Sequence, residues 1–399
     1  MSNNIKGETR NIFIIGAKSI GHYGGYESFI GSLIELHKKI PNLHYIIITK
    51  ANGEGAAYEN VTQDATIARL RLPNIGHAQS IAYDIKAWRY CFKYIQKNVI
   101  NKPIFYILGC RRCLSFRWVM KNAHKLGGTV YINPDGLEWK RLKWSPLVRQ
   151  YLKQCEKAMI NLADLIVCDS LNIKNYICKT YPKKKLQTTY IPYCADLLPS
   201  TIENNNPRFL QWLDENNLSP HDYYLTCSRF VPENNYEIII SEYMKSHSKK
   251  SLIIITTKNE KYLNKLKCTL KFENDSRIHF VDPIYDKELL KKIRENAFAN
   301  IHGHMVGGTN PTLLEALAST PVNLVLDVSF NREVAENAAI YWNMELGNLS
   351  RLIESIDSMD NEKINILSKR AKAIIRSKYS QEQISSQYAN LFMNGSSET

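Results

Sequence analysis

The strongest chemical signal in this sequence is Gly-Gly-Thr-Asn-Pro, which lies between an apolar run and a helical pattern. Glycines let backbone N–H groups approach an anion closely, and the N-terminus of a helix adds partial positive charge. The predicted phosphate ligands are Gly307, Gly308, Thr309 and Asn310. Glu315 follows about one turn later, where a carboxylate could accept hydrogen bonds from the hydroxyls of a ribose. The alternative is that Glu315 is a first-turn acid that complements the helix dipole.

A second glycine-rich turn contains Gly24 and Gly25 and follows the apolar run Ile12–Ile15. Its spacing fits neither a Walker loop nor the Gly-x-Gly-x-x-Gly fingerprint. We interpret it as another turn where backbone N–H groups could meet an anion, with a flexible strand-to-helix connection as the alternative.

Metal and redox chemistry have weak support in the sequence. His302 and His304 are two residues apart without a nearby pair of carboxylates, so we expect no metal site. Cys110 and Cys113 form a single Cys-x-x-Cys without a second pair, and we attribute it to chance.

Short runs rich in Ile, Val, Leu and Tyr alternate with helical patterns along the chain, as buried parallel strands joined by helices would. The predicted strands are Ile12–Ile15, Tyr45–Thr49, Ile104–Leu108, Thr129–Ile132, Leu165–Cys168, Thr189–Ile191, Tyr223–Cys227, Leu252–Thr256, Ile278–Val281, Ala299–His302 and Val322–Leu326. The pattern favours two α/β units, in which ligands bind at the carboxyl ends of the strands. We therefore expect two Rossmann-like domains that face each other across a cleft.

A polar stretch from Ser200 to Pro207 interrupts this alternation and predicts the domain boundary. The expected N-terminal domain covers residues 1–200 and the expected C-terminal domain covers residues 201–375. Residues 376–399 are expected to form a helix and a frayed tail, with the option that the helix packs back on the N-terminal domain.

Composition limits the cellular context and the partners. The 399 residues include 52 Lys and Arg against 38 Asp and Glu, a net charge of +14, which favours an anionic partner. Nine scattered cysteines suit reduced thiols. No export signal is visible, and no apolar run approaches the ~20 residues of a spanning helix. We expect a cytoplasmic protein with, at most, peripheral contact with the inner face of the cell membrane.

Four stretches together resemble the GT-B glycosyltransferases of retaining family four, and the likeness spans almost the whole chain. Within that family they are similar to bacterial polysaccharide β-1,4-rhamnosyltransferases. The stretches are Tyr23–Glu27, Asn133–Arg141, Ser228–Asn235 and Gly307–Pro311. The resemblance implies that the C-terminal domain binds the nucleotide sugar and the N-terminal domain binds the acceptor. It also implies a metal-independent transfer without cofactor, in which the leaving phosphate helps to deprotonate the attacking hydroxyl.

The same resemblance implies that Arg229 contacts the donor diphosphate, a role that suits a planar, permanently charged guanidinium. Two positions depart from the wider family. Asn234 stands where a second, phosphate-binding lysine is common, and Gly307 stands where the first of two glutamates is common. The second of these glutamates corresponds to Glu315.

Four further polar residues are candidates for catalysis. Asp135 lies in a Pro-Asp-Gly turn and could bind the acceptor hydroxyl or the sugar, with a purely structural turn as the alternative. Asp169 and Tyr193 each follow a predicted strand and could project into the cleft, cap a helix or fill the core. Glu233 follows Arg229 in the same loop, where the resemblance would place it toward the donor; the alternative is a solvated loop acid.

The leading interpretation is an enzyme that transfers L-rhamnose from dTDP-rhamnose to a lipid-linked saccharide in surface polysaccharide synthesis, with retention of configuration. The alternatives are a transferase that uses another UDP- or GDP-sugar and a non-enzymatic module that binds nucleotides or nucleic acid. A predicted helix beginning near Pro146 combines basic and aromatic residues and could lie on anionic lipid headgroups, with a solvated basic face as the alternative. Its predicted surface includes Trp139, Lys140, Arg141, Lys143, Trp144, Arg149, Lys153 and Lys157.

Overall fold

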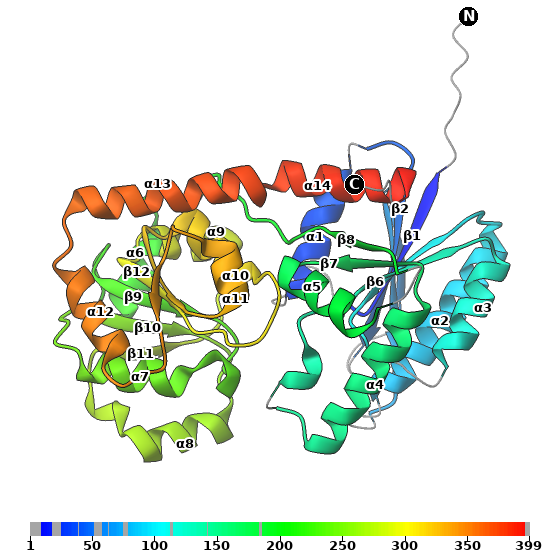
Figure 1. The fold of residues 1–399 in the computed structure, drawn as a ribbon. Coiled ribbons are helices and arrows are strands. Elements are labelled where there is room, and N and C mark those ends of the chain that lie inside the picture. Colours follow the sequence, from blue (N-terminus) through cyan, green and yellow to red (C-terminus); the bar gives the residue numbers. More distant parts are fainter. Residues whose placement is uncertain are drawn as a thin grey trace, which may run out of the picture. The chain divides into compact units, whose positions relative to one another are not determined.

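The chain folds into two compact α/β units, each built around one sheet (Figure 1). The first unit runs to Trp139, resumes over Ser145–Pro192 and ends with the segment from Gln381; the second comprises Lys140–Trp144 and Tyr193–Ser380. The predicted α/β class with two parallel sheets is therefore confirmed. The computed structural model describes residues 9–17, 25–38, 40–51, 58–62, 64–74, 79–111, 115–141, 143–182 and 186–395.

The first unit contains, in the described part of the chain, an eight-stranded sheet of order β3-β4-β2-β1-β5-β6-β7-β8. Its strands are β1 (Arg10–Ile15), β2 (Leu43–Ala51), β3 (Tyr58–Val61), β4 (Ala65–Arg71), β5 (Ile104–Leu108), β6 (Thr129–Asn133), β7 (Leu165–Cys168) and β8 (Thr188–Tyr190). Only β3 pairs antiparallel, at the edge. The helices are α1 (Gly25–His37), α2 (Gln79–Asn98), α3 (Phe116–Lys125), α4 (Pro146–Leu162), α5 (Leu171–Thr180) and α14 (Gln381–Asn394).

The second unit contains a six-stranded sheet of order β11-β10-β9-β12-β13-β14, in which all paired strands are parallel. Its strands are β9 (Tyr223–Cys227), β10 (Ser251–Ile255), β11 (Ile278–Val281), β12 (Ala299–His302), β13 (Val322–Leu326) and β14 (Ile340–Trp342). Its helices are α6 (Pro207–Glu215), α7 (Tyr236–Lys245), α8 (Glu260–Leu270), α9 (Lys287–Glu295), α10 (Pro311–Ser319), α11 (Ser329–Ala335), α12 (Asn348–Asp357) and α13 (Asn361–Lys378).

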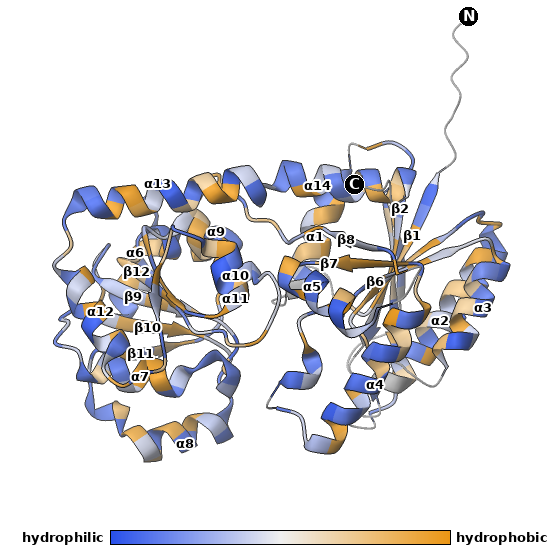
Figure 2. Ribbon diagram, viewed as in Figure 1, coloured by the Kyte–Doolittle hydropathy of each residue, from blue (hydrophilic) through white to orange (hydrophobic). Residues whose placement is uncertain are grey.

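The apolar runs are continuous because helices cover both faces of each sheet. In β10, Leu252 and Ile254 join one apolar cluster, whereas Ile253 and Ile255 join the cluster on the opposite face. Successive strand residues point to opposite faces, so a strand buried on both sides needs apolar residues at every position. Figure 2 shows this pattern as hydrophobic strands and helices that are hydrophilic on part of their surface.

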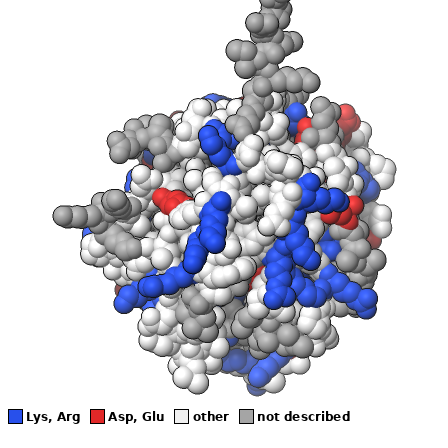
Figure 3. Space-filling view, turned by 90° about the vertical axis from the view of Figure 1, so that its right-hand side faces the viewer, with Lys and Arg blue, Asp and Glu red and all other residues white. Residues whose placement is uncertain are grey.

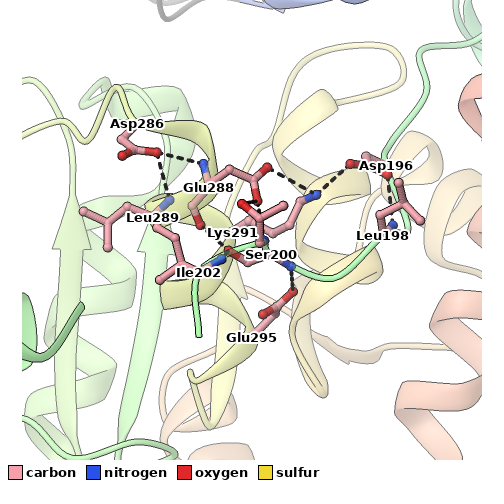
Figure 4. A network of polar contacts seen from close by, with 10 residues as sticks. Asp196, Leu198, Ser200, Ile202, Asp286, Glu288, Leu289, Lys291 and Glu295 are labelled. Atoms are coloured by element: carbon pink, nitrogen blue, oxygen red, sulfur yellow. Dashed lines mark hydrogen bonds and ion pairs between the residues drawn. The ribbon is translucent and has the colours of Figure 1, made fainter. Parts of the chain in front are cut away.

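The second segment of the first unit ends at Pro192. The chain enters the second unit at Tyr193, earlier than the boundary predicted at residue 200. The segment after Tyr193 has no helix or strand before α6, yet hydrogen bonds and an ion pair attach it to α9 (Figure 4). Lys291 Nζ lies 2.6 Å from an Asp196 carboxylate oxygen, and the Ser200 backbone N–H donates to Glu295 over 2.7 Å. Thr201 donates its backbone N–H and its hydroxyl to Glu288 Oε2. The polar stretch Ser200–Pro207 predicted a connection between domains, but its composition did not show that the connection belongs to the second unit.

The C-terminal helix α14 belongs to the first unit, and the chain returns to that unit at Gln381 rather than at residue 376. Tyr388 packs its ring on Phe29 of α1, and its hydroxyl lies 3.0 Å from that of Tyr106 in β5. The Ser385 carbonyl lies 2.9 Å from His37 Nε2. Sequence periodicity predicted a helix in this region, and the buried aromatic residues of α14 explain why it packs on this sheet.

Three strands escaped the sequence prediction, namely β3, β4 and β14. β3 lies at the edge of its sheet, whereas β4 lies between β3 and β2 and has a weak signal because it alternates Ala, Thr and Arg with its few large apolar residues. β14 has only three residues and also lies at an edge. Edge strands need fewer apolar residues because one side of the strand has no partner, so their sequence signal is weak.

The contact between Glu288 and Thr201 predicts a pH-dependent contribution to stability. Hydrogen bonds from the Thr201 backbone hold the pKa of Glu288 below its usual 4.5. A lowered carboxyl pKa stabilises the fold above the usual pKa and loses this effect as the pH falls through the lowered value. We expect Glu288→Gln to lower the melting temperature by about 1–3 °C at about pH 7, and by less at about pH 4.

The matched control for this measurement is Glu260→Gln, because Glu260 is an exposed first-turn acid of α8. This variant should lose less stability than Glu288→Gln at about pH 7, because it removes only the helix-dipole interaction that both first-turn acids share. An equal loss for Glu288→Gln at both pH values would contradict the assigned role of the Glu288 charge.

Candidate functional site

The turn after β9 presents Arg229 on a firmly bonded backbone. The Ser228 carbonyl accepts hydrogen bonds from the hydroxyls of Tyr236 (3.0 Å) and Thr256 (2.7 Å). Asn234 Nδ2 donates to the Arg229 carbonyl over 2.8 Å. The Arg229 side chain itself is exposed, and its guanidinium makes no hydrogen bond or ion pair with other described residues. The backbone that carries Arg229 is therefore fixed, and its charged side chain is accessible from solvent.

Glu233 follows in a short 3₁₀ turn, Pro232–Asn234, and its side chain is only 2% exposed. Neither carboxylate oxygen has a hydrogen-bond partner among the described residues. Buried polar atoms in native proteins nearly always have a partner. The solvated loop acid considered from the sequence is therefore wrong, because the Glu233 carboxylate is buried.

The loop after β12 approaches this turn at Gly303. Met305 N donates to the Glu233 carbonyl over 3.0 Å, and Asn235 Nδ2 donates to the Gly303 carbonyl over 2.8 Å. A Cβ atom on Gly303 would lie 2.4 Å from the Asn234 carbonyl oxygen, so no larger residue fits. The turn after β9 and the loop after β12 are therefore joined by hydrogen bonds within the second unit.

His302 ends β12 and His304 lies in the loop that follows, and their rings stack with centres 4.3 Å apart and planes 11° from parallel. Burial lowers the pKa of His302 to about 3. Burial also lowers the pKa of His304 well below its ordinary value, and the neighbouring His302 ring and the charges of Arg229 and Arg141 lower it further. Both rings are neutral at physiological pH. His302 Nε2 and His304 Nδ1 are buried and have no hydrogen-bond partner among the described residues.

The helix α10 begins at Pro311, where the helical pattern follows the glycine-rich stretch, and Asn310 is its N-cap. Asn310 Oδ1 accepts from the backbone N–H of Thr312 over 3.0 Å. Thr309 is buried, and Gly307 has open space where a side chain would project. The prediction that residues 307–310 bind a phosphate is compatible with this geometry and stays a prediction.

Glu315 lies on α10 and forms an ion pair with Arg294 of α9, with 2.6 Å between Oε2 and Nη1. The Arg294 side chain is 7% exposed and the Glu315 side chain 39% exposed. The sequence offered a ribose ligand or a helix-dipole acid as the role of Glu315, and an ion pair between two helices was not anticipated. The ribose role stays a prediction, and half-exposure leaves part of the carboxylate accessible.

In the first unit, Asp135 follows β6 and Asp169 follows β7, as predicted from the strand pattern. Asp135 has a positive φ of 62°, and its carboxylate accepts the Gly136 backbone N–H over 2.8 Å. Asp169 is buried. Burial raises the pKa of Tyr26 well above its usual range, and the charges of Asp135 and Asp169 raise it further. The structure therefore brings both aspartates close to Tyr26.

Arg111 lies beside the same group, after the end of β5. Burial alone would lower its pKa, but the charges of Asp135 and Glu138 outweigh that effect and raise it. Arg111 also lines a pocket at the carboxyl ends of β1 and β5, together with Lys50, Asp84 and the ring of Tyr83. Sheet order reverses between β1 and β5, which is where ligands of such sheets bind.

The remaining predicted site residues are placed as follows. Gly24 lies outside the described residues, and Gly25 begins α1. Tyr193 is buried and belongs to the second unit, not to the N-terminal domain where the sequence placed it. The sequence had not singled out Tyr26 or Arg111 as site residues. The signal for Arg111 was its position after a predicted strand and Gly109, the same signal that identified Asp169.

The predicted basic and aromatic surface around α4 is partly wrong. Lys153 Nζ lies 4.2 Å from the centre of the Trp139 ring and 3.1 Å from Glu156 Oε1, so it points into a packed cluster. Arg141 is buried and belongs to the second unit. Helical spacing put these residues in one stripe, but cation–π and ion-pair contacts draw Lys153 inward.

The described residues lack two features, a cluster of metal ligands and a membrane-spanning helix. These residues hold no group of three or more His, Cys, Asp and Glu side chains that could bind a metal ion. None of the described helices is both long and apolar enough to cross a bilayer. Cys113 lies outside the described residues, so the structure does not describe the Cys110–Cys113 pair.

Comparison with solved structures gives matches along nearly the full chain. The chain is similar to sucrose-phosphate synthase from Thermosynechococcus elongatus, with 15% identity, a TM-score of 0.79, and coverage of 96% of this chain and 98% of that one. The fold is that of the GT-B glycosyltransferases. HepE from Anabaena, solved in complex with UDP and glucose, matches at 13% identity and a TM-score of 0.71, with 97% and 100% coverage.

A third similar structure with the GT-B fold is α,α-trehalose 6-phosphate synthase from Burkholderia multivorans, at 10% identity and a TM-score of 0.72, with 96% of each chain covered. Residues 9–196 match the family model described as a domain of unknown function, DUF1972. No curated protein matches the sequence. The matched family segment covers most of the first unit, and the structural matches extend through the second.

The close approach at Gly303 predicts a large difference between two glycine variants. Gly303→Ala should lower the free energy of unfolding by about 1–3 kcal/mol, because its Cβ would clash with the Asn234 carbonyl and with Ile239. Gly307→Ala adds the same methyl group where no atom lies within 4 Å, and should unfold like the wild type. Denaturant titration of both variants measures this difference, and similar losses would contradict it.

Proposed function

We propose that this protein is a glycosyltransferase that uses a nucleotide-sugar donor. The observation that carries the proposal is the exposed Arg229 guanidinium, held by the turn after β9 in the same unit as the capped N-terminus of α10. The GT-B fold along nearly the full chain supports it. The buried, unpartnered atoms of Glu233 add a place for hydroxyl groups of a ligand.

In the proposed reaction, Arg229 and the backbone N–H groups of residues 307–310 bind the donor diphosphate. Negative charge grows on the phosphate oxygen as the bond to the sugar breaks, and preorganised donors stabilise that charge more than they stabilise the ground state. The side chains around Tyr26 and Asp135 in the first unit are the proposed site for the acceptor. The reaction proceeds with retention of configuration and needs no bound metal.

The proposed donor is dTDP-L-rhamnose and the proposed acceptor is a lipid-linked saccharide of a surface polysaccharide. The four sequence stretches that resemble rhamnosyltransferases support this choice, including Gly-Gly-Thr-Asn-Pro with glycine at position 307. UDP- and GDP-sugars are the competing donors. UDP and glucose are bound in the similar HepE structure, and the thymine of dTDP differs from uracil by one methyl group.

Purified protein should transfer rhamnose from dTDP-rhamnose to a lipid-diphosphate saccharide in the presence of a metal chelator. A scan of nucleotide sugars for protection against thermal unfolding identifies the donor, because a ligand that binds the folded state raises the melting temperature. Protection and transfer with a UDP-sugar alone would replace the rhamnosyl assignment. No transfer from any nucleotide sugar, with binding to polynucleotide instead, would replace the enzyme proposal.

Arg229→Ala should reduce transfer by about 100-fold or more, the usual cost of removing a preorganised donor to a developing negative charge. Its melting temperature should not change, because the exposed guanidinium makes no contact that holds the fold. Arg370→Ala is the matched control, since Arg370 is an exposed arginine on α13. An active Arg229→Ala enzyme, or one that melts early, would contradict the proposed role.

A basic face on α2 and α3 is the proposed contact with an anionic membrane. Figure 3 shows Lys and Arg side chains gathered on this side of the first unit. The exposed cations are Lys86, Arg89, Lys93 and Lys97 of α2 and Arg117, Lys121 and Lys125 of α3. Their spacing of three or four residues places them on one side of each helix. Trp118, which is 49% exposed, packs edge-on against Phe92 and joins the two helices.

Membrane binding is tested by charge reversal on this face. A variant with Lys93, Lys97, Lys121 and Lys125 changed to Glu should lose about 100-fold or more in affinity for vesicles containing phosphatidylserine, since each cation contributes about 1 kcal/mol. Reversing Lys369, Arg370, Lys372 and Arg376 of α13 makes the same change in net charge and should have little effect. Equal losses in both variants would indicate a response to net charge alone.

A further inference from the structure

Arg141 lies in a short segment of the chain that belongs to the second unit. Residues 140–144 belong to the second unit, although the segments before and after them belong to the first. The Arg141 side chain is buried, with only 7% of its surface exposed. The turn that carries it is closed by a hydrogen bond from Trp144 N to the Arg141 carbonyl, at 3.3 Å. Burial of a charge is costly. A buried arginine in a segment of five residues therefore suggests that its charge interacts with groups nearby.

Arg141 is close enough to His304 for its charge to lower the pKa of the ring. The charges of Arg229 and Arg141 both act on the His304 ring, and both are positive. His304 is 6% exposed, and its Nδ1 atom is buried with no hydrogen-bond partner among the described residues. Two permanent positive charges beside a neutral ring with an unused nitrogen favour an anion that also accepts hydrogen bonds.

The His304 ring and backbone are each held by one contact. The ring stacks on His302, and Asn331 Nδ2 donates to the His304 carbonyl over 3.0 Å. Asn331 also donates to the Leu326 carbonyl, which links the loop to the end of β13. A fixed ring nitrogen is suited to a single hydrogen bond in a defined direction.

We propose that Arg141 and His304 complete, with Arg229, the binding site for the diphosphate of the donor. His304, in the tautomer with its proton on Nδ1, donates a hydrogen bond to a phosphate oxygen, and Arg141 supplies a second positive charge. This inference rests on the proposed function and extends it. It also explains how the site can function with Asn234 where related sequences place a second cation, because Arg141 supplies that charge from the other half of the chain.

Neither residue transfers a proton in the reaction. The bond between the anomeric carbon and the phosphate oxygen breaks, and its electron pair stays on the phosphate. The acceptor oxygen forms the new bond to carbon, and the acceptor proton passes to that phosphate oxygen. The hydrogen bond from His304 and the charge of Arg141 strengthen as negative charge accumulates on the leaving group.

The test compares the affinity of the full-length protein for dTDP and dTMP, and for UDP and UMP, by calorimetry. His304→Leu and Arg141→Gln should each weaken diphosphate binding by about 10-fold or more, because hydrogen bonds to charged groups are stronger than neutral ones. Monophosphate binding should change little. His304→Asn, whose amide nitrogen lies near the position of Nδ1, should recover part of the loss.

Lys143→Ala is the matched control, because it removes an exposed cation from the same short segment. It should bind both nucleotides like the wild type. Thermal melting of each variant checks that the fold is intact, and partial recovery in His304→Asn separates hydrogen bonding from packing.

Three outcomes would overturn the inference. The diphosphate affinities of His304→Leu and Arg141→Gln could equal that of the wild type, or diphosphate and monophosphate affinities could fall equally, or His304→Asn could bind no better than His304→Leu. A wild-type protein that binds no nucleoside diphosphate would contradict the proposed function itself, so the two failures are distinguishable.

Discussion

The hydrogen bonds between the turn after β9 and the loop after β12 determine where the polar groups of the second unit lie. Met305 N binds the Glu233 carbonyl, Asn235 binds the Gly303 carbonyl, and the missing side chain of Gly303 lets the two backbones meet. Parallel strands alone would align the ends of β9 and β12, but would not fix the loops that follow them. Since Arg229, Glu233 and His304 all lie on these loops, their positions depend on this junction.

Neutral rings, one exposed cation and one buried carboxyl group lie at this junction. Histidines 302 and 304 are neutral because they are buried, whereas the arginine at 229 keeps an exposed charge. Glu233 is enclosed without a hydrogen-bond partner among the described residues. Such groups lower the stability of the isolated fold, and a ligand that satisfies them recovers that loss. This is the physical argument that supports the proposed binding site in the second unit.

Sequence reasoning predicted the central strands because each is buried on both faces, and runs such as Leu252–Ile255 have no other simple explanation. It also predicted a helix directly after Gly-Gly-Thr-Asn-Pro, since local backbone chemistry determines helix starts. It could not predict the pairing of Glu315 with Arg294, because the two residues lie 21 positions apart on different helices. For the same reason it placed Lys153 on a surface, when Trp139 and Glu156 hold it inside.

The path of the chain between the two units has a practical consequence for fragments of this protein. The first unit is assembled from three pieces of sequence and the second from two, so no single cut separates them. A fragment that ends at Pro192 contains all the strands of the first sheet but lacks α14, whose Tyr388 and Phe392 stack with Tyr106. Its apolar surface would be open to water and to other copies of itself, so expression of either half alone is a poor route to a folded domain.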